Sequence, residues 1–412
     1  MDDGTDRPRG ALYAELCTDE REFAGLGPAW TRLQGRCSAA TPFQSHAWLH
    51  SWWLSYGRRG RLRIVLVREG GELLAAAPLT FVRSPLPALV PLGGAISDFA
   101  DVLIDDERAD HAAVALTSQL SALARTALID FREVRPGAAV ERVYDLWRGP
   151  RRRVADSVCL ELPARPMEEL LTRLPAARAQ RVRAKLRKLG HLGVEPRAVP
   201  HDEVATALRT MLDLHRLQWQ GRTVTAEHIR PRFHEHLVRS IGPMVRSGDA
   251  VVTEFRLDGD VLAVDVTLLS RELACGYLYG AHPVLRERKA DVATMLLHAC
   301  AELASGGGHQ VLSLLRGSEP YKLHWRPETV VNQRLLLARR RTAPLLSSAV
   351  CEAAARSRGR KLVRRRRERG AGGRGPPPPP PGGGGRPPPP PHTHHPPPPP
   401  QNPPPPRPPP GL

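Results

Sequence analysis

The stretch from Cys275 to Trp325 most constrains the fold, because it orders a strand, a loop, a helix and a second strand before a compact polar cluster. The strands are expected at 275–279 and 310–315, and the helix includes residues 292–303. The helix ends at a Ser-Gly-Gly-Gly run, which is typical of a helix stop. A loop that leads into a helix is also a ready anion site, because free backbone N–H groups and the helix dipole point at the ligand.

The cluster from Arg316 to Lys322 places a guanidinium, a carboxylate, a phenol and an amine within seven residues. Such a combination suits an enzyme that holds a phosphorylated cofactor and moves a proton. No other part of the chain is as dense in reactive side chains.

The rest of the second half extends this α/β pattern. A strand is expected at 154–163, helices at 174–189, 202–220 and 226–246, a hairpin at 250–257 and 261–270, and a last strand at 330–338. The hairpin turns at Asp258-Gly259, a strong short-range hairpin signal. In its second strand, Leu262, Val264, Val266 and Leu268 share one face. Asp265 points to the opposite face.

The helix at 174–189 combines an apolar stripe with six basic residues and no acidic partner at helical spacing. One interpretation is a surface for phosphates or for an anionic substrate. The other is a solvated helix face. The residues alone leave these two alternatives equal.

The first half predicts a separate mixed α/β unit. Two helices are expected within 22–56, a hairpin at 62–68 and 73–83, a loop leading into a strand within 91–105, a helix at 109–125 and a strand at 127–134. In the helix at 45–56, Trp48, Trp52 and Trp53 recur at helical spacing, which favours a core stripe over a stacking platform for bases. The basic segment 148–153 marks the expected boundary, so the predicted units are 20–150 and 154–338.

Residues 339–412 have a different composition, with 24 of the 43 prolines and 15 basic against 2 acidic residues. Such a segment cannot bury enough apolar area to offset the entropy of ordering, so we expect a disordered, basic, proline-rich tail with polyproline II character. It could contact an acidic lipid surface or nucleic acid, or bind a partner through its prolines. We favour a dispensable low-complexity tail.

The six cysteines show neither a C-x-x-C pair nor a cluster at zinc spacing. We therefore expect free thiols in a reducing compartment and do not expect a metal site. The N-terminus is polar, unlike a signal peptide, and the longest apolar run, near 73–82, is about half as long as a membrane span. These features predict a soluble cytoplasmic protein.

The order of elements in the second half resembles the GNAT acyltransferase fold, as found in the CelD-type (cellulose-biosynthesis) acetyltransferase family. The segment LRGSEPYKLHW (315–325) carries the resemblance most sharply, with LHRLQWQGR (214–222) before the hairpin. HAWLHSWWLSYG, LLAAAPL and the loop from Asp98 to Asp101 resemble the N-terminal half of the same family. The resemblance covers about 20–335 and implies two GNAT-like lobes in one chain, an arrangement that FemABX-type aminoacyl transferases share.

This resemblance implies transfer of an acyl group from acetyl-CoA, the expected co-substrate, to a small-molecule or polysaccharide-related amine or hydroxyl acceptor. The cofactor would bind at the loop of Arg286, Arg288, Lys289, Ala290 and Asp291. The family's loop carries a Pro-Gly pair there, and glycine lets backbone N–H groups approach a pyrophosphate closely. Here charged side chains take its place, and Ser313 replaces the family's acidic residue on the last core strand.

Acyl transfer requires a general base, stabilisation of the carbonyl and an acid near the leaving sulfur. We select Glu319 as base or substrate clamp, Tyr321 as acid and Asp265 as a second candidate base. Residues expected to bind the substrate are Arg316, Lys322, Tyr277 and Tyr279. The structural alternatives are a Glu319–Arg316 ion pair that fixes the loop and a Tyr321 ring in the core with its hydroxyl in water.

Three other functions stay open at this stage. The chain could transfer an aminoacyl group from a charged tRNA, in which case the basic helix would meet RNA. It could be a non-catalytic GNAT-like binding protein. Nucleic acid could also bind through the tail alone, although no specific nucleic-acid partner is expected.

Overall fold

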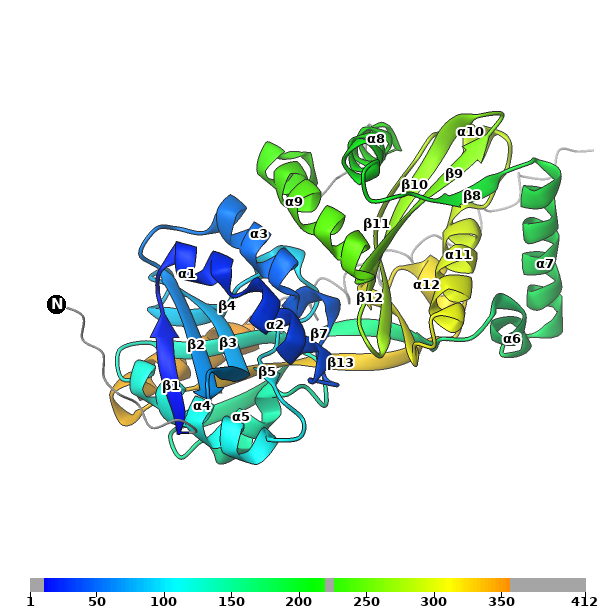
Figure 1. The fold of residues 1–412 in the computed structure, drawn as a ribbon. Coiled ribbons are helices and arrows are strands. Elements are labelled where there is room, and N and C mark those ends of the chain that lie inside the picture. Colours follow the sequence, from blue (N-terminus) through cyan, green and yellow to red (C-terminus); the bar gives the residue numbers. More distant parts are fainter. Residues whose placement is uncertain (1–10, 219–225, 356–412) are drawn as a thin grey trace, which may run out of the picture. The chain divides into compact units, whose positions relative to one another are not determined.

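The strands of the protein form one continuous mixed sheet, seen in a computed structural model that describes residues 11–218 and 226–355 (Figure 1). The strand order is β1-β2-β3-β4-β6-β13-β7-β12-β11-β10-β9-β8, with β5 paired to β3. The predicted mixed α/β class is therefore confirmed. The strands are β1 (Leu12–Cys17), β2 (Leu62–Glu69), β3 (Glu72–Val82), β4 (Ala88–Pro91), β5 (Leu103–Ile104), β6 (Leu128–Val134), β7 (Arg151–Pro163), β8 (Glu195–Ala198), β9 (Ala250–Leu257), β10 (Asp260–Leu269), β11 (Leu273–Ala281), β12 (Val311–Arg316) and β13 (Glu328–Leu337).

Helices cover this sheet. They are α1 (Glu20–Gly25), α2 (Gly27–Gly35), α3 (His46–Tyr56), α4 (Ala109–Leu123), α5 (Val140–Leu146), α6 (Met167–Thr172), α7 (Ala176–His191), α8 (Val204–Gln218), α9 (Pro231–Ser247), α10 (Val284–Glu287), α11 (Val292–Gly306) and α12 (Pro320–Leu323), with short 3-10 turns η1 (Pro42–Gln44), η2 (Gly94–Ile96), η3 (Ala226–Ile229) and η4 (Arg340–Thr342). None of the helices in the described ranges is long and apolar enough to cross a membrane.

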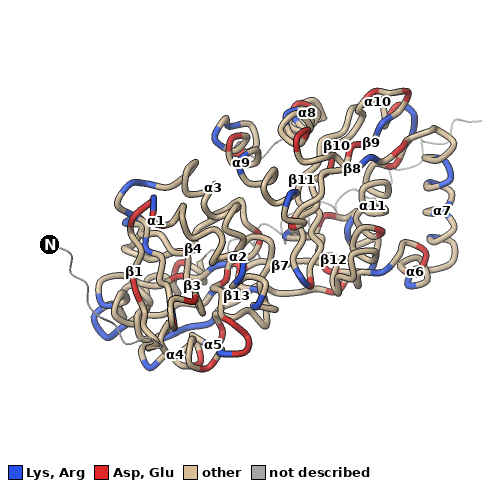
Figure 2. The backbone as a smooth tube through the Cα atoms, in the orientation of Figure 1, with Lys and Arg blue, Asp and Glu red and all other residues tan. Residues whose placement is uncertain are grey.

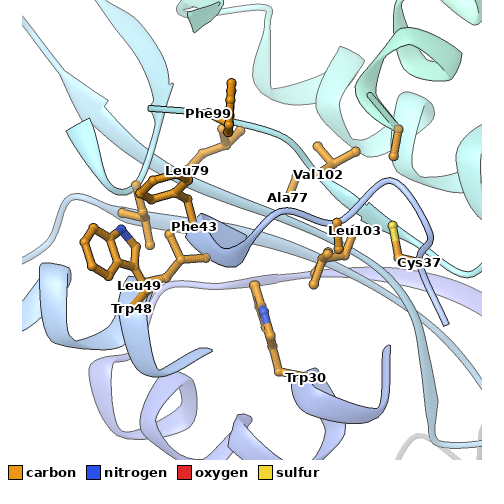
Figure 3. Packing of buried hydrophobic residues seen from close by; sticks show 14 of the residues in the cluster. Trp30, Cys37, Phe43, Trp48, Leu49, Ala77, Leu79, Phe99, Val102 and Leu103 are labelled. Atoms are coloured by element: carbon orange, nitrogen blue, oxygen red, sulfur yellow. The ribbon is translucent and has the colours of Figure 1, made fainter. Parts of the chain in front are cut away.

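The N-terminal half contains the predicted hairpin of β2 and β3, against which α4 packs. Two helices were predicted within 22–56, but the structure has three, because Pro28 starts α2 in its first turn and separates it from α1. Trp30 and Trp48 are fully buried, and their indole N–H groups donate to Gln44 O and Ser97 Oγ, both at 2.8 Å. Figure 3 shows these two rings among the aliphatic side chains of the core.

Strands β7 and β13 run through both halves of the sheet (Figure 1). They pair with each other from Arg151↔Leu337 to Glu161↔Glu328, while β13 also pairs with β6 and the end of β7 pairs with β12. The basic segment 148–153 expected at the boundary therefore supplies the first residues of a central strand. The division into units 20–150 and 154–338 stays a prediction, because residues 11–355 lie within one compact unit.

The C-terminal half confirms the predicted hairpin of β9 and β10. Its turn residues Asp258 and Gly259 have φ values of 54° and 91°, the left-handed pair that such a turn requires. Strand β11 follows antiparallel to β10, and α11 then connects β11 to the parallel strand β12. Helices α8 and α9 lie beside this part of the sheet, and α9 contacts α3 of the N-terminal half.

The chain remains ordered beyond the last strand. Residues 343–355, assigned to the tail by their sequence, form a helix in which Leu346 and Ala349 are buried against the sheet. The expected disordered, proline-rich segment otherwise falls on residues 356–412, which lie outside the described residues. All six cysteines are free, as predicted, and five of them are buried, whereas Cys351 is exposed.

We predict that Leu335→Ala in β13 lowers the free energy of unfolding by about 2–5 kcal/mol, because it leaves a cavity in the central strand. The side chain of Leu335 is 0% exposed. The matched control is Val331→Ala in the same strand, where the side chain is 44% exposed and the expected loss is below about 1 kcal/mol. Urea unfolding of both variants measures the difference. Equal losses would contradict the placement of β13 at the centre of the core.

Candidate active site

A cavity of about 900 Å³ lies among the strands β10, β11 and β12, the helices α3, α8 and α11, and the loop before β5. Its volume lies within the range of small-molecule and cofactor sites. The lining residues fall into an apolar wall, a strip of strand backbone and two polar groups. The apolar wall comes from α11 and β12 and consists of Ala293, Leu296, Leu297, Cys300, Leu312, Leu314 and Leu315.

The cavity opens where two parallel strands separate. Strands β11 and β12 pair only from Leu273↔Val311 to Cys275↔Ser313. Beyond Cys275, β11 continues as Gly276–Tyr279 along the cavity wall. Strand β12 stays paired with β7, with a register shift between Ser313 and Arg316 where Leu315 has a φ of 58°. The edge of β11 that β12 leaves therefore faces the cavity.

A β-bulge interrupts this strip of β11. The register with β10 runs Val266↔Leu278 and then Thr267↔Gly276, so that Tyr277 has no directly opposed partner. A bulge leaves the backbone of its extra residue unpaired in the ladder. The Tyr277 hydroxyl donates to Ile96 O at 3.0 Å, and the partly buried ring contacts Trp48 edge-on. The backbone and the ring of Tyr277 form part of the cavity wall. A role of Tyr277 in substrate binding stays a prediction.

Arg316 lies at the rim, held by partners from the N-terminal half. Its guanidinium pairs with Asp98 and with Glu133, the latter at 3.2 Å, and also donates to the carbonyls of Ala95 and Ser97. The anticipated Glu319–Arg316 pair is therefore wrong: the acidic partners of Arg316 come from elsewhere in the chain. Any substrate anion would have to share this guanidinium with its protein partners.

The rest of the predicted cluster is one short turn. Glu319 precedes α12 and forms an ion pair with Lys322 at 2.8 Å, and the Lys322 ammonium also donates to Arg316 O at 3.0 Å. Gly317 has a φ of 110°, and a Cβ there would lie 2.5 Å from the Glu319 carboxylate, which explains the glycine in this motif. Tyr321 is 45% exposed and lines the cavity. Partial burial and the neighbouring Glu319 carboxylate raise the pKa of its phenol, which therefore stays protonated at neutral pH.

Asp265 lines the cavity and is fully buried on β10. Its carboxylate accepts from Thr267 Oγ1 at 3.0 Å and from the Cys300 thiol at 3.5 Å. Burial raises the pKa of Asp265 to about 6, because these two weak donors only partly replace water. Among the described residues, no group of three or more His, Cys, Asp or Glu side chains is placed to hold a metal ion.

The predicted cofactor loop lies apart from this wall. None of its five residues (Arg286, Arg288, Lys289, Ala290, Asp291) is among the described residues that line the cavity. Asp291 instead caps α11, where its carboxylate accepts from Thr294 N at 2.9 Å and pairs with Lys185 of α7. Burial acts to raise the pKa of Asp291, but Lys185 and the Thr294 N–H outweigh it, and the net pKa is lowered. The N-terminus of α11 thus already carries a carboxylate.

The sequence did not single out a second polar group, which consists of Tyr56, His215, Glu227, His228 and Arg232. His215 Nδ1 lies 2.8 Å from Tyr279 O, and His228 Nδ1 lies 3.4 Å from His215 Nε2. Gly280 brings α8 against β11, since a Cβ there would lie 2.1 Å from Met211 O. His215 belongs to the segment 214–222 that carried the family resemblance. A single histidine in that segment forms no motif with another reactive residue, so the sequence did not predict a role for it.

Tyr279 and Trp52 complete the lining on this side. The Tyr279 hydroxyl accepts from Gln218 Nε2 at 3.2 Å, so this predicted substrate residue borders the cavity next to α8. Trp52 of α3 also lines the cavity, whereas Trp48 and Trp53 are buried in the core. The predicted core stripe is thus correct for two of the three tryptophans.

Comparison with known proteins supports the GNAT assignment. Residues 176–323 match the model of the acetyltransferase (GNAT) domain. The fold is similar to that of FemX, with 11% identity over 81% of this chain and 98% of that chain and a TM-score of 0.55. It is also similar to the C-terminal domain of a putative lysylphosphatidylglycerol synthetase from Agrobacterium fabrum (12% identity, 81% of this chain and 97% of that chain, TM-score 0.51). L-PGS from Bacillus licheniformis has the same identity and TM-score, over 81% of this chain and 96% of that chain.

The comparison with curated proteins gave no match. The low identities mean that the solved structures show a shared fold alone, while the domain match concerns the part of the chain that forms most of the cavity. A GNAT-type acetyltransferase domain is therefore present, and the protein is an acyltransferase enzyme.

We predict that Arg316→Lys lowers the free energy of unfolding by about 2–4 kcal/mol, because lysine cannot span two carboxylates and two carbonyls and leaves partly buried charges without partners. Arg181→Lys is the matched control, since this exposed arginine on α7 should lose less than about 0.5 kcal/mol. Thermal and urea unfolding report both values. An Arg316→Lys variant as stable as wild type would show that the network contributes nothing to folding.

The raised pKa of Asp265 predicts a specific pH dependence of stability. The folded carboxyl titrates near 6 and the unfolded one near 3.8, so the folded state binds the extra proton and wild type loses stability as the pH rises between these values. Asp265→Asn removes this loss. The variant should therefore gain about 1–2 kcal/mol relative to wild type between pH 4.5 and pH 7. Urea unfolding at both pH values measures the gain, and a constant difference would mean that Asp265 is not protonated in the fold.

Proposed function

We propose that the protein is an N-acyltransferase, an acetyltransferase that moves an acyl group from acyl-CoA to an amine or hydroxyl acceptor. The carrying observation is the exposed strip of β11, where β12 departs after Cys275 and a bulge leaves Tyr277 unpaired beside a cavity of about 900 Å³. An extended donor that carries amide groups can add to such a strip as a further strand.

The pantetheine arm of coenzyme A is a donor of this kind. Its amides would pair with the backbone of 276–278, and the apolar wall from α11 would cover its methylene groups. The unpaired backbone N–H at Tyr277 would then donate to the thioester carbonyl, because a fixed donor in a site without water stabilises the developing oxyanion.

The diphosphate end of the donor needs a different partner from the one predicted. Asp291 caps the N-terminus of α11, and its carboxylate would repel a phosphate placed at the same helix end. Arg286, Arg288 and Lys289 are exposed just before that point and supply positive charge outside the cavity. We propose that they bind the phosphates as side chains rather than through a glycine-lined loop.

The remaining predicted roles depend on the pairings in the fold. Tyr321 keeps its proton at neutral pH and is the proposed acid for the leaving thiolate. Glu319 is paired with Lys322, so it acts as a base or clamp only when a substrate competes with that pair. Asp265 is the better placed of the two carboxylates for the inner cavity, but its protonated form below about pH 6 would be inactive as a base.

Aminoacyl transfer from charged tRNA is the second candidate function. It is favoured by the extent of the fold similarity to FemX and by the basic residues along α7 (Figure 2). Some of these residues have partners, since Arg183 pairs with Glu168 and Lys185 with Asp291. Arg181, Arg187 and Lys188 have no ion pair among the described residues and would supply the phosphate contacts.

The finer family assignment is also a proposal. The segment 315–325 supports a CelD-type acetyltransferase with a small-molecule or polysaccharide-related acceptor, in a cytoplasmic protein. If the protein were instead a non-catalytic binding protein, it would bind a ligand in the cavity without converting it. Contact of the basic tail with an acidic surface concerns residues outside the described part of the chain.

We predict that the full chain binds acetyl-CoA and that Gly276→Leu weakens this binding at least about tenfold, because the side chain would fill the strip beside β11. A Cβ at Gly276 would meet only the Cys300 sulfur, at 3.6 Å, so Gly276→Ala is the matched control and should bind nearly as wild type does. Isothermal titration at high protein concentration measures all three affinities. Absence of binding by wild type would refute the acyl-CoA donor, and salt-sensitive binding of charged tRNA in its place would support the alternative.

A further inference from the structure

Two histidines beside the cavity have their ring protons fixed by the chain. A carbonyl oxygen only accepts, so His215 Nδ1, 2.8 Å from Tyr279 O, carries the hydrogen. In a neutral ring, His215 Nε2 then has a lone pair. His228 Nδ1 lies 3.4 Å from it and must be the donor. The lone pair of His228 therefore lies on Nε2, which has no hydrogen-bond partner among the described residues, and His228 lines the cavity.

The surroundings keep both rings neutral. Burial lowers the pKa of His215, and burial together with the neighbouring His215 lowers that of His228 to about 4. Glu227 is the nearest carboxylate, but both its oxygens pair with Arg232, at 2.7 and 2.8 Å. Arg230 also pairs with Glu227. The carboxylates of Asp213 on α8 and Glu235 on α9 pair with Arg216 and Arg239. None of these is a free carboxylate that would favour an imidazolium.

The position of the pair relates it to the donor strip. His215 is anchored to the carbonyl of Tyr279, the residue that follows the exposed backbone of 276–278 on the same strand. His228 extends from His215 and stacks on Phe233 of α9, with ring centroids 4.9 Å apart. A nucleophile at His228 Nε2 would therefore approach a thioester held along β11.

We propose that His228 accepts the proton of the acceptor nucleophile during acyl transfer, and that His215 is the positioning residue that fixes its tautomer. This inference rests on the proposed acyltransferase function and adds the group on the acceptor side. The nucleophile forms a bond to the thioester carbonyl carbon while its proton goes to His228 Nε2. The C–S bond then breaks, the sulfur takes a proton from Tyr321, and His228 returns its proton to Tyr321 through solvent.

The low basicity of His228 indicates the kind of acceptor. A neutral imidazole of this kind cannot remove a proton from a resting ammonium ion, but it can accept one as positive charge develops on the attacking atom. The adjoining wall is a stacked pair of rings, Trp52 and Tyr56, with centroids 5.7 Å apart and planes 20° apart. The acceptor is therefore a hydroxyl or an uncharged amine next to a flat or apolar body, not a lysine-type ammonium.

Hydroxylamine, which is small and uncharged at neutral pH, serves as the probe acceptor with acetyl-CoA and the full chain. Hydroxamate formation is followed after subtraction of the protein-free rate. His228→Gln should lower kcat about 100-fold or more and leave the KM for acetyl-CoA unchanged. His215→Gln should lower kcat about tenfold, since a base then lacks its fixed orientation. The control is His201→Gln at an exposed turn, which should match wild type.

A readout independent of turnover is the ring ¹⁵N spectrum of the protein, assigned with the same variants. At pH 7 both His215 and His228 should show the neutral form with the hydrogen on Nδ1. Two results would overturn the role of the histidine pair while leaving the acyltransferase function intact. One is an Nε2–H form of His228, and the other is an unchanged kcat in a folded His228→Gln variant while wild type is active. A wild-type protein that neither binds acetyl-CoA nor forms hydroxamate would overturn the proposed function and this role with it.

Discussion

The continuity of one sheet through β7 and β13 determines where everything else can lie. These strands exchange hydrogen bonds along their length, and each also pairs with a strand of a different half. An isolated C-terminal sheet would expose the edge of β13, which in this fold is covered by β6 of the N-terminal half. The sequence suggests two lobes, whereas the hydrogen bonds make them one sheet. The cavity can therefore include side chains from both halves.

The charge network at the rim follows from this arrangement. A guanidinium placed between the halves has lost much of its water, so it is stable only with compensating partners, which Asp98 and Glu133 provide from the N-terminal half. Asn332 of β13 donates to Glu133 at 3.0 Å and extends the network to the central strand. We infer that Arg316 acts first in joining the halves, and that this fixed position is what makes it available at the rim of the cavity.

The sequence predicted the local elements well because their signals are local. The Asp258-Gly259 turn, the strand into Gly276–Tyr279 and the glycine-terminated helix α11 each depend on neighbouring residues. Partners distant in sequence could not be predicted, and this explains both the incorrect Glu319–Arg316 pair and the absence of His228 from the expected site. Trp52 of α3 and His228 of η3 line the same cavity. No periodicity in the sequence indicates that these two segments come together.

Asp291 shows the other limit of such inference. An aspartate directly before an apolar helical run is a typical N-cap, and the structure confirms that local role. Proximity to an expected phosphate site nevertheless favoured assigning it to the cofactor. The two roles conflict physically, because a carboxylate that already accepts from the helix N–H groups also repels a phosphate. Local capping chemistry was therefore the better guide at this position than the family pattern.

Strand β11 places the two proposed reactants relative to each other. Its backbone is open to the donor at 276–278, and one residue later its carbonyl is occupied by His215, which holds His228. The distance between donor carbonyl and base is thus set by consecutive residues of a strand that pairs with β10 along most of its length. A site built on such a strand changes its spacing little when the surrounding helices move. This argues that selection of the acceptor lies in the helices α3 and α9, while β11 and the pair it holds fix the geometry of transfer.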